Sequence, residues 1–151
     1  MLPLAMPPIP VEHLPRMPRD KSIGIGCIGS GFIMADCHLV AYRKAGFNPV
    51  AIAARNIERT QQVAERHSIP NAYRDYREML DVPEVEIVDV AVPPDVQFEI
   101  IREITTRRNG IRGILAHKPL GVDYSQGNKI FRMCEDAGIS LEVNQNMRYD
   151  Q

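Results

Sequence analysis

The chain has 151 residues, of which 44% are hydrophobic and 25% charged, and its formal net charge is −1. A chain of this length forms one domain with a sizeable core, and its composition is far from that of a disordered protein. The near-neutral charge argues against a dedicated nucleic-acid-binding protein, and the lack of any apolar run of about 18 residues argues against a membrane span.

The first twenty residues differ from the rest of the chain, because they hold six of its twelve prolines and no glycine. We expect residues 1–20 to be an extended arm, either a disordered tail or a segment that lies on a neighbouring subunit. The segment lacks the basic start and unbroken apolar region of a signal peptide.

The three cysteines are too few and too widely spaced for a disulfide framework. Their pattern fits a reducing compartment, so we expect a cytoplasmic protein. Cys37 and His38 are adjacent, but no CxxC or HxxxH partner completes a ligand set, and we therefore expect no metal site.

From Lys21 onward, short apolar runs alternate with amphipathic segments. The apolar runs predict strands at residues 23–28, 50–54, 86–92, 111–117 and 139–143. The segments between them predict helices at residues 32–45, from Asn56 to His67, at 76–81, over an apolar stripe from Val96 to Ile104, and from Gly127 to a C-cap at Gly138.

Five strands that are apolar on both faces and alternate with helices are typical of a buried parallel sheet. Right-handed crossovers then predict a doubly wound α/β fold with three layers, a Rossmann fold. We therefore divide the chain into the arm, residues 1–20, and one Rossmann domain, residues 21–151.

A glycine-rich segment follows the first predicted strand and opens the first helix. It reads Gly29-Ser30-Gly31-Phe32-Ile33-Met34. Gly29 permits a tight turn, Gly31 lets a pyrophosphate approach the backbone, and the amides near Phe32 and Ile33 face the anion. Met34 replaces the third glycine of this motif, so an ordinary glycine turn remains the alternative.

The end of the second strand is where a dinucleotide site reads the adenosine ribose. NAD sites usually carry an acidic residue there, whereas this chain has Ala54 followed by Arg55 and Asn56, with Arg59 one turn on. Arginine suits a 2′-phosphate, which favours NADP over NAD. The alternative is that Arg55 and Arg59 are solvated surface charges.

Five segments in order carry a resemblance to a known family. They are Gly29-Ser30-Gly31-Phe32-Ile33, Ala53-Ala54-Arg55, Val90-Ala91-Val92-Pro93-Pro94, His117-Lys118-Pro119-Leu120 and Asn144-Gln145-Asn146-Met147-Arg148-Tyr149. From about Ser22 to Gln151 the chain resembles the glucose–fructose oxidoreductase / inositol dehydrogenase / MocA (GFO/IDH/MocA) family.

The resemblance implies a role for Lys118 beside the nicotinamide and the substrate, where it assists proton transfer from the reacting hydroxyl. It also implies that Pro93 and Pro94 flank the nicotinamide ribose, although prolines also suit a helix start. His117 stands where the family usually has glutamate, so the local proton network is open. The Lys118–Pro119 bond is a candidate for a cis peptide.

Polar residues follow the fifth predicted strand, at the sheet edge where open α/β sheets bind ligands. These are Asn144, Gln145 and Arg148. Their side chains suit hydrogen bonds to the cofactor amide or to substrate hydroxyls, or they cap the strand end.

The resemblance also implies a second α/β domain, absent from this chain, with much of the substrate pocket and the face of a homo-oligomer. We therefore expect the cofactor half of an oxidoreductase that uses NADP or NAD and acts on a sugar, polyol or related small hydroxy compound, and expect the chain alone to be inactive. The alternative is a non-catalytic dinucleotide-binding or regulatory module. A methyltransferase using S-adenosylmethionine is less favoured, because the second strand lacks a ribose-binding acid.

Overall fold

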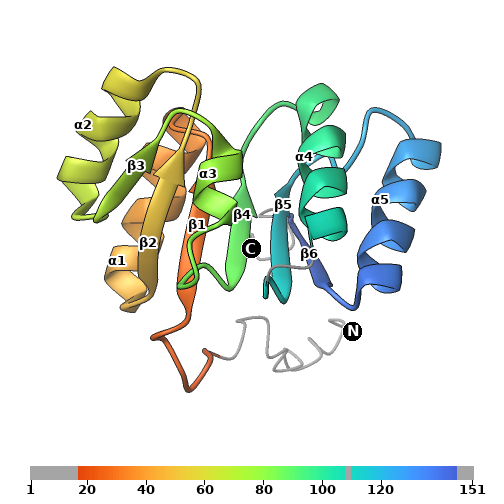
Figure 1. Ribbon diagram of the computed structural model, residues 1–151, viewed down its shortest axis with the longest axis horizontal. Coiled ribbons are helices and arrows are strands. Elements are labelled where there is room, and N and C mark those ends of the chain that lie inside the picture. Colours follow the sequence, from red (N-terminus) through yellow and green to blue (C-terminus); the bar gives the residue numbers. More distant parts are fainter. Residues whose placement is uncertain (1–16, 108–109, 146–151) are drawn as a thin grey trace, which may run out of the picture.

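The computed structural model describes residues 17–107 and 110–145, and in it six parallel strands form one sheet flanked by helices (Figure 1). The strands are β1 (Gly24–Ile28), β2 (Asn48–Ala53), β3 (Asn71–Tyr73), β4 (Ile87–Val90), β5 (Gly113–His117) and β6 (Ser140–Asn144). Their order in the sheet is β3-β2-β1-β4-β5-β6, the arrangement of a Rossmann fold. The predicted fold class is confirmed.

Helical segments connect the strands. They are η1 (Ile33–His38), α1 (Leu39–Ala45), α2 (Ile57–His67), α3 (Tyr76–Leu80), α4 (Pro94–Arg107) and α5 (Tyr124–Ala137). Every strand pair is parallel, so all carboxyl ends meet at one edge of the sheet.

Two apolar clusters hold the layers together. On one face, Cys27 and Ile52 pack with Leu39 of α1, and on the other Val88 packs with Ile101 of α4. These five side chains are fully buried. Burial of both sheet faces explains why the strands read as continuous apolar runs.

Strand β3 was absent from the prediction, which gave five strands instead of six. It spans three half-buried residues and pairs only with β2, with Ala72 beside Ile52. A strand this short at the edge of a sheet has no apolar run of its own, so only pairing reveals it.

The helix boundaries are set by local signals that the sequence carries. Asn56 caps α2, because its Oδ1 accepts a hydrogen bond from the Arg59 amide at 2.9 Å. Gly138 ends α5 with φ of 69°, a left-handed conformation that favours glycine. Both predicted caps are confirmed.

The predicted helix at residues 32–45 begins as a π-helical turn, η1, before continuing as α1. A π-turn adds about one residue per turn to the α-helical spacing, so an apolar pattern this short does not distinguish the two. Met34 lies within η1 and is fully buried.

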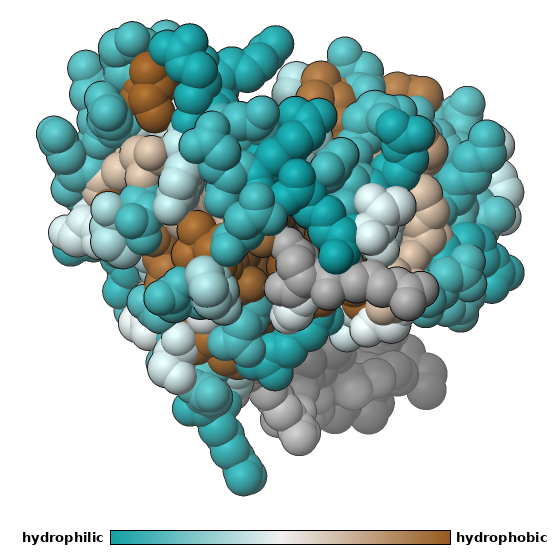
Figure 2. All heavy atoms as spheres, in the orientation of Figure 1, coloured by the Kyte–Doolittle hydropathy of each residue, from teal (hydrophilic) through white to brown (hydrophobic). Residues whose placement is uncertain are grey.

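Hydrophilic residues dominate the face shown in Figure 2, and hydrophobic side chains show mainly near its centre. Among the helices of the described residues, none is long and apolar enough to cross a membrane. Most of the predicted arm, residues 1–16, lies outside the described residues, and residues 17–20 are exposed.

His67 gives the fold a pH dependence. It lies on the last turn of α2 and is 5% exposed, and burial lowers its pKa below 6.5. The Ala35 backbone and the charge of Asp36 act in the opposite direction, whereas the charges of Arg66 and Arg43 lower the pKa further. In the unfolded chain a histidine titrates at about 6.5, so the unfolded state takes up the proton first.

We therefore expect the free energy of unfolding to fall as the pH is lowered from 8 to about 5, since the stability that neutral His67 contributes is present above its unfolded pKa and lost below it. Urea unfolding across this range, with His67→Leu as the comparison, measures the effect. The variant should show a flatter dependence; an equal slope in both proteins contradicts the assignment.

Candidate functional site

The glycine turn after β1 lies where three strands end together. The amide of Gly29 donates to the Ala53 carbonyl of β2 at 2.9 Å, and the Gly29 φ is 109°. A Cβ on Gly29 would lie 2.4 Å from the Ala91 carbonyl oxygen beyond β4. Both the left-handed backbone and this close approach require glycine here.

Gly31 leaves the space in front of the turn open. A Cβ built on it would meet nothing within 4 Å, and its carbonyl accepts the Ala35 amide at 2.8 Å, which begins the helix. Phe32, the N-cap residue of η1, is 65% exposed and its apolar side chain makes no capping hydrogen bond. The amides of this turn therefore suit an anionic ligand.

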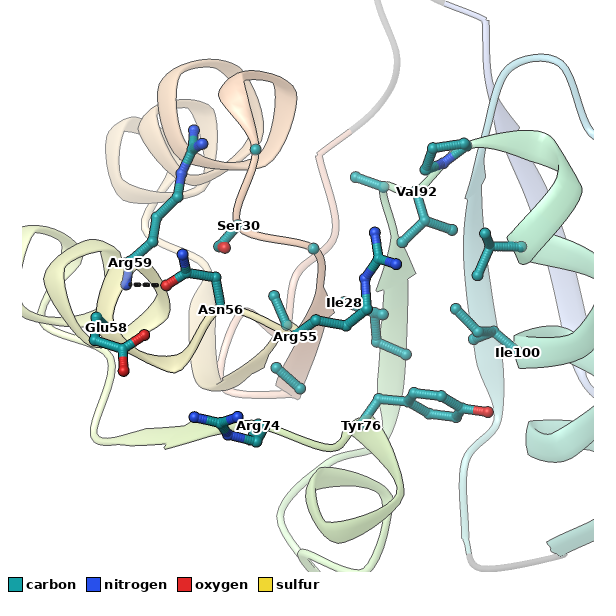
Figure 3. A pocket seen from close by; sticks show the side chains of 17 residues that line it. Ile28, Ser30, Arg55, Asn56, Glu58, Arg59, Arg74, Tyr76, Val92 and Ile100 are labelled. Carbon is teal, nitrogen blue, oxygen red and sulfur yellow. Dashed lines mark hydrogen bonds between the residues drawn. The ribbon is translucent and has the colours of Figure 1, made fainter.

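A cavity of about 820 Å³ opens beside the turn, between the carboxyl ends of β1, β2 and β4 (Figure 3). Its size is within the range of small-molecule and cofactor sites. The predicted site residues that line it are Gly29, Ser30, Gly31, Arg55, Asn56 and Pro93. The structure therefore brings the glycine turn and the end of the second strand into one site.

Charged side chains gather at the β2 side of the cavity. Arg55, Glu58 and Arg59 line it together with Arg74, which follows β3 (Figure 3). Glu58, in the first turn of α2, brings a carboxylate to the same wall as the arginines.

Lys118 follows β5, two strands away from the glycine turn. The side chain is exposed, and the Lys118–Pro119 bond is cis, as predicted for this pair. His117, Lys118 and Asn144 do not line the cavity, but they end β5 and β6 at the same edge of the sheet. The cavity therefore lies at the ends of β1, β2 and β4, and Lys118 lies farther along the same edge, after β5.

Comparison with known proteins assigns the chain to a family. A model for GFO/IDH/MocA oxidoreductases, described as an oxidoreductase family with an NAD-binding Rossmann fold, matches residues 23–145. The chain belongs to this family. The family that the sequence motifs indicated is therefore confirmed.

Individual relatives are dehydrogenases and reductases. The chain is 32% identical over 116 residues to a trans-1,2-dihydrobenzene-1,2-diol dehydrogenase of Xenopus tropicalis, covering 77% of this chain and 33% of that one. It is 28% identical over 116 residues to D-xylose 1-dehydrogenase (NADP(+)) 2 of Haloferax volcanii, covering 77% and 35%. The 3-ketoreductase KijD10 of Actinomadura kijaniata, solved with NADP and TDP-benzene, has a TM-score of 0.73 at 28% identity, covering 81% and 37%.

The chain thus spans about a third of the length of these relatives. What it contains is the NAD(P)-binding oxidoreductase domain of the GFO/IDH/MocA family, and the region matched by the family model ends at residue 145.

In this oxidoreductase domain a buried polar cluster ties the first helix to the sheet. Asp89 of β4 is fully buried, and its Oδ2 accepts hydrogen bonds from His38 Nδ1 at 2.7 Å and from the Tyr42 hydroxyl at 2.6 Å. Burial and the charge of Asp89 raise the pKa of Tyr42 far above its usual range, so the phenol stays protonated and donates.

The same cluster reaches Asn144 at the end of β6. The Asn144 Nδ2 lies 2.7 Å from His38 Nε2, so a histidine protonated at Nδ1 accepts a hydrogen bond from the amide. His38 is 8% exposed. Asn144 therefore has a partner within the fold, and its contact with a cofactor or substrate stays a prediction.

The remaining predicted residues lie outside the cavity. Phe32 and Ile33 are in the turn beside it, Pro94 begins α4, and Gln145 is exposed beyond β6. Arg148 lies outside the described residues. No group of three His, Cys, Asp or Glu side chains in the described part of the chain is arranged to hold a metal ion, so the metal prediction stays untested.

Gln97 had no role in the sequence analysis, and the structure places it against the loop that carries Lys118. Gln97 is fully buried in α4, and its Nε2 donates to the carbonyls of His117, Pro119 and Leu120 at 3.1, 3.2 and 2.9 Å. Its Oε1 accepts the His117 amide at 3.0 Å. One side chain therefore holds the backbone on both sides of Lys118. No pattern in the sequence predicts this role.

We expect Gln97→Leu to lower the free energy of unfolding by about 2–4 kcal/mol, because it leaves several backbone groups of the loop without partners. Chemical denaturation measures this, with Gln62→Leu on the exposed face of α2 as the matched control, expected to change stability by less than about 0.5 kcal/mol. Equal effects of the two substitutions would show that the Gln97 contacts contribute nothing.

Proposed function

We propose that this chain is the cofactor half of an enzyme that transfers hydride between NADP and a sugar, polyol or related small hydroxy compound. The observation that carries the proposal is the convergence of β1, β2 and β4 on a glycine turn that opens into the cavity of about 820 Å³. Membership of the GFO/IDH/MocA family supports the reaction class. We also propose that the full-length enzyme forms a homo-oligomer, and this part of the proposal rests only on the resemblance to the family.

The residues of the turn fit a dinucleotide. Gly31 leaves room for a pyrophosphate against the backbone, and the amides at the start of η1 point into a region that no side chain caps. The adenosine would then extend past the end of β2 toward Arg55 and Asn56, and the nicotinamide past β4, where Pro93 borders the cavity. When bound, the dinucleotide supplies the nicotinamide ring that accepts or returns hydride.

Lys118 is the residue of this chain best placed for proton transfer. Its loop is held by Gln97 at the end of β5, on the side of the sheet edge where the nicotinamide would lie. As hydride leaves a carbinol carbon, the hydroxyl oxygen must lose a proton, and an amine at Nζ accepts or relays it. His117, beside Lys118, adds a second titratable side chain to this end of the site.

NADP is the favoured cofactor because arginines outnumber acids at the β2 side of the cavity. Guanidinium groups bind phosphate oxygens with two parallel hydrogen bonds, whereas Glu58 would repel a phosphate or accept from a free ribose hydroxyl. Relatives of this chain use either cofactor: they include a dehydrogenase named for NADP, a reductase solved with NADP and a levoglucosan dehydrogenase solved with NADH, so the preference rests on the arginines.

Titration with NADP, NAD and S-adenosylmethionine tests the cofactor. We expect NADP at about 100 times its dissociation constant to add about 2.7 kcal/mol to the free energy of unfolding, measured as a thermal shift. NAD should bind more weakly, and S-adenosylmethionine should cause no shift. A shift with S-adenosylmethionine alone would overturn the proposed function.

In the same titration, Ala54→Asp is expected to raise the ratio of NAD to NADP affinity by about tenfold or more, because its carboxylate accepts from the ribose hydroxyls and repels the 2′-phosphate. Ala54→Asn has nearly the same shape without the charge, and it serves as the matched control. A ratio that stays unchanged in the aspartate variant contradicts the placement of the ribose at Ala54.

Substitution of Lys118 tests the proton-transfer role. In assays of the full-length enzyme of which this chain is the cofactor half, which follow NADP reduction with sugars and polyols, Lys118→Met should lower turnover by about 100-fold or more while the NADP affinity stays within about twofold. Lys129→Met, on the exposed face of α5, is the control and should behave like the unmodified protein. Turnover of the full-length enzyme that survives Lys118→Met removes the residue from the mechanism, and the absence of turnover in the unmodified full-length enzyme favours a non-catalytic module.

A further inference from the structure

Most arginine side chains of the described residues are already paired with the protein. Their partners are carboxylates or backbone carbonyls, as in Arg66 with Asp36, Arg77 with Asp75, Arg107 with Asp81, Arg112 with Glu86 and Arg132 with Glu135. Within the described ranges, the arginines whose side chains make no hydrogen bond or ion pair are Arg19, Arg55, Arg59 and Arg74.

Three of these four unpaired arginines line the one cavity beside the glycine turn. They come from different elements: Arg55 follows β2, Arg59 lies in the first turn of α2, and Arg74 follows β3 (Figure 3). Only Glu58 supplies negative charge among the residues that line this cavity. A net positive wall that the fold leaves unneutralised suits an anionic group of a ligand.

Arg74 owes its place to the strand that the sequence did not reveal. The Ala54 amide donates to the Tyr73 carbonyl at 3.2 Å, which fixes the end of β3 beside the end of β2. The residue after β3 is thereby held next to Ala54 and Arg55. Arg74 is exposed and makes no contact that the folded chain needs.

The strand order indicates which part of a dinucleotide reaches Arg74. Outward from the glycine turn of β1, the carboxyl edge presents first the end of β2 and then the end of β3. The pyrophosphate belongs at the turn and the adenosine ribose at the end of β2, so a group beyond the ribose lies at the end of β3. On NADP that group is the 2′-phosphate.

We propose that Arg74 is a further cofactor-specificity residue, which binds the 2′-phosphate of NADP together with Arg55 and Arg59. The inference rests on the proposed function and adds to it a residue outside the glycine turn and the β2 end. The three guanidinium groups point away from one another in the unliganded chain (Figure 3). Their side chains are exposed and unpaired, so they can rotate toward a phosphate monoester, whose three terminal oxygens accept hydrogen bonds from different directions. Each contact between a guanidinium group and the phosphate also offsets the electrostatic repulsion that the three arginines exert on one another when no ligand is bound.

Adenosine 2′,5′-bisphosphate and adenosine 5′-monophosphate are the probes, because they differ by the 2′-phosphate and lack the nicotinamide. In calorimetric titrations of the full chain, Arg74→Ala should lower the affinity for the bisphosphate about tenfold, because one charge-assisted contact is lost. The same substitution should lower the affinity for the monophosphate less than about twofold. Arg74→Lys should recover part of the loss, since it keeps the charge without the planar donor pair.

Arg19→Ala is the matched control, because Arg19 is also exposed and unpaired but lies outside the cavity. It should change neither affinity by more than about twofold, since exposed charges separated by more than a Debye length are largely screened at physiological salt. If Arg74→Ala lowers the affinity for both probes equally, the inference is overturned in favour of stacking on the adenosine. If the substitution lowers the affinity for neither probe, the inference is overturned as well. Failure of the unmodified chain to bind any dinucleotide overturns the proposed function instead.

Discussion

The close approach of three strand ends at Gly29 is the constraint on which the site depends. The Gly29 amide is bonded to β2 through Ala53, and its α-carbon lies against the Ala91 carbonyl that follows β4. Any side chain at this position would separate the strands and turn the backbone out of its left-handed conformation. The cavity exists because β1 ends here and its helix starts on the far side of the turn.

Parallel pairing then distributes the chemistry along one edge of the sheet. Because all carboxyl ends meet at that edge, residues far apart in sequence become neighbours in a fixed order: Arg74, Arg55, Gly29, Pro93 and His117. The order places the unpaired arginines toward one end of this edge and Lys118 toward the other. A dinucleotide laid along this edge would reach both ends, which is the physical basis for proposing an oxidoreductase.

Two buried polar side chains connect this edge of the sheet to the helices and loops around it. Asp89 joins the first helix to β4 through His38 and Tyr42, and Gln97 holds the backbone around Lys118 with four hydrogen bonds. Buried polar groups without partners destabilise a fold, so these networks tie the position of each helix to the sheet. The exposed arginines of the cavity contrast with them, since nothing in the fold needs their charge.

The sequence by itself determined the fold class, the glycine turn, the cap at Asn56 and the family, because these depend on local periodicity and on motifs a few residues long. Tertiary structure decided what depends on pairing between distant segments. Strand β3 has too few residues to show a pattern, so the positions of Arg74 beside Arg55 and of Glu58 on the same wall followed only from the folded chain. Gln97 likewise gains its role from a loop twenty residues away, a contact that no spacing along the chain encodes.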